Sequence, residues 1–184
     1  MLERVRRGDG AAFADLFARH RAPVYRYAVH MAGPGEAEDV VQEVFLALLR
    51  QVDGYDPDRG PLQPYLLGIA RRMVFRRVAG ARLDEQLDDE AAGETLADDG
   101  IASPFETIDR AETLERVRAA VAALPDVYRE AIVLCEFNEL DYAAAAGVIG
   151  CPIGTVRSRL HRARGLLAER LAPAMRRKVS ANGR

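Results

Sequence analysis

Basic and short polar side chains cluster on one side of a helix that the sequence predicts from Ile153 to about Arg170. The apolar side of this helix recurs at intervals of three and four residues: Ile153, Val156, Leu160, Ala163 and Leu167. The opposite side carries Thr155, Arg157, Ser158, His161 and Arg162, with Arg159 nearer the core boundary. Such residues suit base edges and phosphates in a major groove. The alternative is a solvated basic face on an ordinary helical hairpin.

The residues before this helix favour the first interpretation. Asp141 is a good N-cap for a short helix ending at Ile149, and Gly150, Cys151 and Pro152 predict a turn. A short helix, a turn and a longer helix make a helix-turn-helix outline. From Cys151 to the end of the chain there are nine basic residues and one acidic residue, Glu169. We therefore expect duplex binding that weakens steeply with salt.

A second candidate nucleic-acid surface lies on a helix predicted from Pro64 to about Ala79. Its inward face carries Leu66, Ile69, Ala70 and Met73. Its outer face carries Tyr65, Arg72 and Arg76, with Phe75 on the flank and further charge from Arg71, Arg77 and Arg82. An aromatic ring among arginines can stack on bases while the charges hold phosphates, as single-stranded DNA requires. Alternatively, Tyr65 is a partly buried core aromatic and the arginines form a solvated face.

A third surface lies on a helix predicted from Glu36 to Val52. Its buried stripe comprises Ala37, Val40, Val41, Val44 and Leu48. The other side presents Asp39, Gln42, Glu43, Leu46 and Arg50. Leu46 is an apolar residue in the middle of a polar face, a pattern found at protein-docking surfaces. A single exposed leucine is also ordinary on a protein surface, so this residue alone does not decide between the two interpretations.

No set of residues predicts catalysis, a metal site or a cofactor. His20, His30 and His161 lack acidic or cysteine partners at metal-ligand spacing, and no phosphate-binding glycine motif occurs. Cys135 and Cys151 lie in different predicted elements, the first in a helix and the second in the turn of the helix-turn-helix outline. Buried, inert thiols are the favoured interpretation of these cysteines, and a redox-sensitive pair is the alternative.

The elements that position these surfaces are all predicted to be helical, in two small domains. Asp9 is expected to cap the first long helix, Pro23 to break or restart it, and Gly33 to end the continuation. The predicted segments are an N-terminal domain at 1–82, a linker at 83–107, a second domain at 108–172 and a basic tail at 173–184. Residues 83–109 carry 10 acidic residues and no basic one, whereas the flanking parts are net basic. This pattern is typical of two modules that bind a polyanion and are joined to each other by an acidic, self-repelling connector.

Length and composition agree with this organisation. A chain of 184 residues is enough for one mid-sized domain or two small ones, and 49% hydrophobic with 29% charged residues fits a folded protein. No run of 18 apolar residues predicts a membrane span, and the N-terminal residues lack a secretory pattern. We therefore expect a cytoplasmic protein without direct membrane insertion.

Three segments together resemble the sigma-70 family of bacterial RNA polymerase sigma factors, in the compact extracytoplasmic-function (ECF) class. EAEDVVQEVFLALL at 36–49 resembles the family's polymerase-docking helix. FNELDYAAAAGVIGCPIGTVRSRLHRARGLL at 137–167 is similar to its promoter-reading helix-turn-helix, and ALPDVYREAIVL at 123–134 to the helix before it. The resemblance spans about residues 9–80 and 108–172, which would be sigma regions 2 and 4.

The resemblance implies a promoter-specificity subunit that catalyses nothing itself. Its partners would be promoter DNA, core RNA polymerase through the largest-subunit clamp helices and the flap, and an anti-sigma factor that could hold it at the membrane. Polymerase binding is implied for Asp39, Gln42, Glu43 and Leu46. The −10 element is implied for Tyr65, Arg71, Arg72 and Arg76, with the loop at 53–62 holding the unpaired strand. The −35 element is implied for Thr155, Arg157, Ser158, Arg159 and Arg162.

Two other functions remain open. A stand-alone, dimeric helix-turn-helix regulator would read a symmetric operator and would not need Leu46. A protein-sequestering module would never touch DNA and would show no salt-dependent duplex binding.

Overall fold

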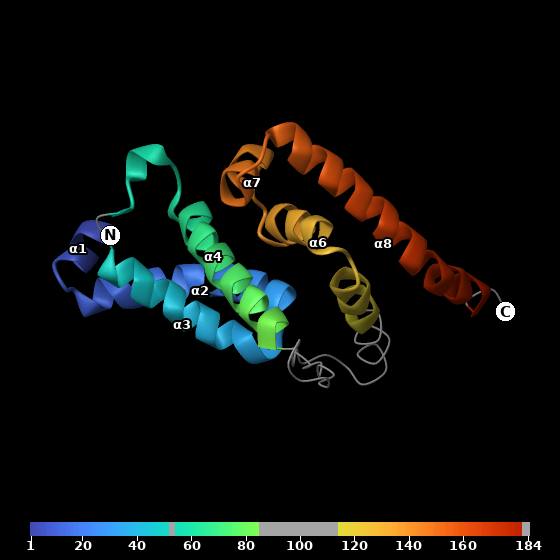
Figure 1. Cartoon of the computed structure of the whole chain (residues 1–184), viewed down its shortest axis with the longest axis horizontal. Helices are drawn as coiled ribbons and strands as arrows, with labels where there is room; N and C mark the ends of the chain where they lie inside the picture. Colours follow the sequence, from blue (N-terminus) through green and yellow to red (C-terminus); the bar gives the residue numbers. More distant parts are fainter. Residues whose placement is uncertain (52–53, 85–113, 182–184) are drawn as a thin grey trace.

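The computed structural model describes residues 1–51, 54–84 and 114–181, and within those ranges every regular element is helical (Figure 1). The prediction of an all-α chain is confirmed. The N-terminal group consists of α1 (Leu2–Arg6), α2 (Gly10–Ala32), α3 (Pro34–Arg50), the 3₁₀ turn η2 (Pro57–Arg59) and α4 (Leu62–Asp84). A helix over residues 114–122 opens the second group. It continues with α6 (Asp126–Ile132), the π-helical turn η3 (Val133–Phe137), α7 (Tyr142–Ile149) and α8 (Ile153–Ala181).

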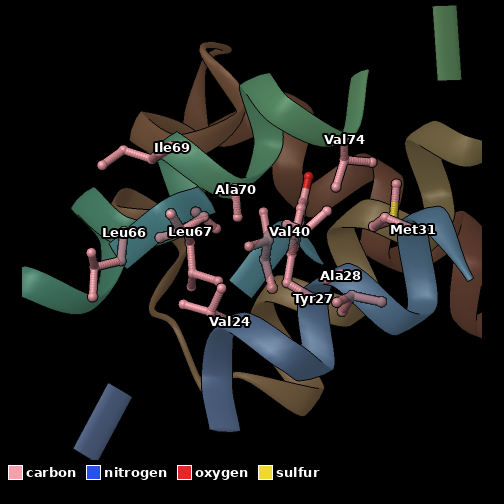
Figure 2. Packing of buried hydrophobic residues seen from close by; sticks show 14 of the residues in the cluster. Val24, Tyr27, Ala28, Met31, Val40, Leu66, Leu67, Ile69, Ala70 and Val74 are labelled. Atoms are coloured by element: carbon pink, nitrogen blue, oxygen red, sulfur yellow. The ribbon is translucent and has the colours of Figure 1, made fainter. Parts of the chain in front are cut away.

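In the first group, α2, α3 and α4 pack around a common core, part of which Figure 2 shows. All five residues of the predicted apolar stripe on α3 are buried, with at most 2% of their surface exposed. Asp9 caps α2 as expected, because its carboxylate accepts a hydrogen bond from the backbone N–H of Ala12 at 3.0 Å. Gly33 ends α2 with a φ of 90°, a conformation that favours glycine.

The expected break at Pro23 is wrong, because α2 runs through this residue without interruption. Proline lacks the N–H donor and crowds the carbonyl four residues earlier, at a cost of about 3 kcal/mol. Beyond the proline, however, Val24, Tyr27 and Ala28 are all fully buried in the core. Each large apolar side chain contributes about 1.5–3 kcal/mol on burial, which offsets the cost of the proline.

In the second group, α7 and α8 form the predicted helix-turn-helix outline. The Asp141 carboxylate accepts a hydrogen bond from the Ala144 N–H at 2.7 Å, and Gly150 ends α7 in the left-handed conformation with a φ of 75°. Val156, Leu160 and Ala163 are buried as expected. Ile153 was expected in the same stripe but is 42% exposed. Helical side chains lean toward the N-terminal turn, and the first residue of α8 has no such turn to cover.

The two groups pack on each other: α2 contacts α6 and η3, and α4 contacts α7. Most of the predicted linker, from residue 85 to 107, lies outside the described residues, and residues 83 and 84 still belong to α4. The domain boundaries therefore stay a prediction. No described helix is both long enough and apolar enough to cross a membrane.

Candidate nucleic-acid and protein interfaces

The α3 surface is exposed as the sequence predicts. Asp39, Gln42, Glu43 and Leu46 all lie on the solvent side of the helix. Leu46 is 40% exposed, and Leu49, one helical turn further, is 41% exposed. Leu49 was missed, although its spacing of three residues from Leu46 places the two side chains on one face. The α3 face therefore presents two neighbouring leucines beside acidic residues, a combination suited to a protein partner.

Glu43 also has a role inside the fold. Arg77 of α4 donates a hydrogen bond to the Glu43 carboxylate at 2.7 Å and pairs with Glu36 as well. This half-buried arginine ties the C-terminal half of α4 to α3 and offsets part of the negative charge on the α3 face. The sequence pattern predicts only a general positive charge for Arg77 and neither of these two partners.

The α4 surface brings together only part of the predicted set. Arg72 and Arg76 are exposed one turn apart, with Phe75, which is 38% exposed, on their flank. Neither arginine has an acidic partner among the described residues. Arg71 instead turns toward the second domain and donates from Nε to the Glu130 carboxylate at 2.8 Å. Its guanidinium carbon also lies 4.6 Å from the centre of the Phe75 ring.

Tyr65 lies at the start of α4 in contact with the preceding loop. Its ring centre is 5.2 Å from that of Tyr55, which is buried. The Tyr55 hydroxyl donates to the Gly60 carbonyl at 2.8 Å, and Arg6 donates to the Tyr55 carbonyl at 3.2 Å. The loop is thereby folded against the end of α4 that carries Tyr65, which is half-buried rather than fully displayed.

The α8 surface presents its basic side chains largely as predicted. Arg157, Ser158, His161 and Arg162 are exposed, whereas Thr155 and Arg159 are half-buried. Ser158 donates from its hydroxyl to the Thr155 carbonyl at 2.9 Å. The Arg157 guanidinium carbon lies 5.9 Å from the centre of the Tyr142 ring on α7. Arg157, Arg159 and Arg162 have no acidic partner within the described part of the chain, so this face is available to an anion.

The two cysteines are free thiols, each half-buried. Burial, followed by the nearby Glu136 carboxylate, raises the pKa of Cys135 to about 11. The thiol is therefore protonated at neutral pH, which disfavours nucleophilic reactivity. No group of metal-ligating side chains occurs in the ranges that the structure describes.

His30 lies between the two helical groups, with its ring centre 4.8 Å from that of Phe137. Burial lowers its pKa to about 4, and the charges of Arg118 and Arg129 act in the same direction. Between the ordinary histidine pKa of 6.5 and a pH of about 4, His30 is protonated in the unfolded chain but stays neutral in the folded protein. Stability is therefore lost as the pH falls from about 6.5 toward 4.

We expect the melting temperature followed by circular dichroism to fall across this pH window. His30→Gln removes the titrating ring, so its curve should fall less between pH 6.5 and 4. The difference between the two curves isolates His30 from the carboxylates that also titrate at low pH. Identical slopes for the two proteins would contradict the assignment.

Comparisons with known proteins cover both helical groups. Residues 16–83 match Sigma-70 region 2, and residues 114–167 match Sigma-70, region 4. The chain is 30% identical over 178 residues to the ECF RNA polymerase sigma factor SigW of Bacillus subtilis, covering 92% of this chain and 94% of that protein. It is also 30% identical over 182 residues to the ECF RNA polymerase sigma-E factor of Escherichia coli K12, covering 96% and 95%.

Two solved structures share the fold. The sigma factor RpoE, in complex with the anti-sigma factor NepR from Bartonella quintana, is 25% identical with a TM-score of 0.75, covering 88% of this chain and 97% of that one. CnrH, in complex with the cytosolic domain of CnrY, is 26% identical with a TM-score of 0.66, covering 94% and 95%.

Proposed function

Since the chain belongs to the sigma-70 family and to its ECF class, we propose that it is a promoter-specificity subunit of bacterial RNA polymerase. In this proposal it binds core polymerase, places its two domains on two promoter elements and directs transcription initiation. It forms no bond itself, because nucleotide addition belongs to the polymerase. It works in the cytoplasm, where promoter and polymerase are found.

The observation that carries the proposal is the combination of three surfaces on one chain. An exposed leucine pair beside acids lies on α3, exposed arginines lie on α4, and unpaired arginines lie on the second helix of a helix-turn-helix. A stand-alone DNA-binding regulator needs only the last of these. A sequestering module needs only the first.

Each set of exposed residues has the chemistry for a different partner: the polymerase, the −10 element or the −35 element. Asp39, Gln42, Glu43 and Leu46 bind the clamp helices of the polymerase, with Leu49 extending the apolar contact. Arg72 and Arg76 hold phosphates of the −10 strand, while Arg71 and Tyr65 join them from less exposed positions. Thr155, Arg157, Ser158, Arg159 and Arg162 face the −35 duplex, where arginine pairs well with guanine and with phosphate. The second domain also meets the polymerase flap.

An anti-sigma factor is a further proposed partner. RpoE and CnrH, the two structural relatives, were each solved with a bound protein, named as an anti-sigma factor in the case of RpoE. A chain that shares the fold across both domains offers comparable surfaces to such a protein. Anchoring of that partner in a membrane would hold this chain at the membrane without any insertion of its own.

The proposal is tested by transcription from the DNA upstream of the protein's own gene. Purified core polymerase is incubated with that DNA with and without the full chain, and the transcripts are mapped. We expect a discrete new start site that depends on the added protein. Failure of the chain to bind core polymerase, measured by co-elution, would refute the sigma function and favour the stand-alone regulator.

A further inference from the structure

A buried carboxylate joins the two helical groups. Glu130 of α6 is 1% exposed, and its Oε1 accepts two hydrogen bonds. The Tyr27 hydroxyl of α2 donates one and Arg71 Nε of α4 donates the other, both at 2.8 Å. These three residues, named here the Glu130 cluster, come from two α-helices of the first domain and one of the second.

The chemistry of the cluster suits a closed state of the two domains. Tyr27 has no exposed surface, and burial followed by the negative charge of Glu130 raises its pKa, so its hydroxyl remains a donor. The Arg71 side chain keeps 28% of its surface exposed, whereas that of Glu130 keeps 2%. Arg71 therefore supplies the counter-charge from the edge of the contact while Glu130 occupies its centre.

Two neighbouring contacts join the same domains. Gln63 of α4 donates from Nε2 to the Asn138 carbonyl at 3.0 Å, and His30 of α2 packs on Phe137. Phe137 ends the π-helical turn η3, and Asn138 follows it directly. A π-helical turn widens the backbone locally. Here, its end presents a ring and a backbone carbonyl to the first domain.

The energetics of this contact favour reversibility. Burying an ion pair costs desolvation energy that its attraction only about repays, so a complete cluster adds little net stability. Removing one partner leaves buried polar groups unsatisfied, which is far more costly. Domain separation returns Glu130 and Arg71 to water together. The closed and open states can therefore lie close in free energy while the closed state depends strongly on Glu130.

We propose that the Glu130 cluster holds the two domains closed on each other and keeps Arg71 away from promoter DNA until the domains separate. The second half of this inference rests on the proposed function of Arg71 at the −10 element. In the closed state the Glu130 carboxylate occupies the Arg71 Nε and offsets its charge, which leaves a weaker site for a phosphate. Closure and DNA binding therefore compete at this residue, and the apparent DNA affinity decreases as the fraction of open molecules decreases.

The first test is small-angle X-ray scattering on the free full-length chain. We expect the wild type to be compact and Glu130→Ala to have a clearly larger radius of gyration, with the closed-to-open ratio shifted at least about tenfold. Glu38→Ala is the charge-matched control, since Glu38 pairs with Arg21 within one domain. Unchanged scattering of a folded Glu130→Ala protein would overturn the inference.

Glu130→Gln covers the case in which the alanine variant does not fold. This isosteric change keeps the acceptor for Tyr27 but removes the charge that pairs with Arg71, so a smaller opening is expected. Circular dichroism of each variant establishes that the helices are intact. Compact scattering of folded Glu130→Gln, together with an unfolded alanine variant, would also overturn the proposal.

The second test measures binding of a fluorescein-labelled single-stranded oligonucleotide to the free chain by anisotropy. We expect Glu130→Ala to lower the Kd about tenfold and the double variant Glu130→Ala/Arg71→Ala to lose this gain. If Glu130→Ala increases the radius of gyration without increasing the DNA affinity, the proposal that closure keeps Arg71 from DNA is refuted. The proposal that the Glu130 cluster holds the domains closed would still stand. The transcription assay is independent of both results, so the proposed function succeeds or fails separately.

Discussion

Asp39→Ala combined with Leu46→Ala is expected to abolish transcription by reconstituted polymerase. Both side chains are exposed on α3, and Leu46 is 40% exposed. Truncation at the centre of an interface costs about 2 kcal/mol or more per residue, and 1.4 kcal/mol is a factor of ten. The double variant should therefore bind core polymerase about two to three orders of magnitude more weakly. The measurement is a titration of core polymerase, with transcript yield as the second readout.

The same double change should leave the fold intact. Neither residue makes an ion pair or a side-chain hydrogen bond within the described residues, and neither belongs to the core. The matched control is Glu38→Ala combined with Leu114→Ala, which removes one carboxylate and one leucine that is 47% exposed. The exposed Glu38–Arg21 pair is worth at most about 1 kcal/mol. Equal loss in the control, or none in the test variant, would contradict the docking assignment.

The helices and their caps could be predicted because their signals are local. The α3 stripe repeats with the helical period, so five buried positions follow from sequence spacing alone. Asp9 and Asp141 bond to backbone N–H groups three residues away, within reach of a single turn. The error at Pro23 has the opposite origin. The helical residues on both sides of Pro23 are buried against α3 and α4, and this tertiary stabilisation is not part of the local rule that proline breaks a helix.

For the candidate surfaces too, the local features could be predicted from the sequence and the tertiary contacts could not. Exposure of the α3 and α8 faces follows from the helical period, whereas the partner of Arg71 does not. Glu130 lies 59 residues from Arg71 and 103 from Tyr27 in the sequence. Nothing in the local pattern of α6 indicates that its one carboxylate facing the core will meet two donors from another domain. The local pattern therefore predicts the same surface for Arg71 as for Arg72 and Arg76, although Arg71 faces Glu130.

The π-helical turn is a further feature that the sequence did not reveal. The pattern from Pro125 to Phe137 predicts one helix, and the backbone widens at Val133. The Val133 carbonyl accepts the backbone N–H of Asn138, five residues on, and also the side-chain amide of Asn138, both at 3.0 Å. This small departure places Phe137 against His30, at the contact between the domains.

Arg157→Ala is expected to weaken binding of duplex −35 DNA by about 5- to 150-fold, the effect of losing one good arginine–base pair at about 1–3 kcal/mol. Arg157 is exposed on α8, and its guanidinium lies over the Tyr142 ring, which limits the directions in which it can point. Arg157→Lys keeps the charge but not the planar fork, so it should recover only part of the affinity. Anisotropy with promoter duplex and with a scrambled duplex measures both.

The salt dependence separates a base contact from a phosphate contact at this position. A phosphate contact contributes about −0.9 to the slope of log K against log salt concentration, whereas a base contact contributes specificity. If Arg157 reads a base, Arg157→Ala reduces the preference for the promoter duplex and leaves the slope nearly unchanged. Arg21→Ala, which removes an exposed charge from the other domain, should change neither quantity. Uniform weakening on both duplexes, with a flatter slope, would place Arg157 on the phosphate backbone and leave sequence reading to Arg162 and its neighbours on α8.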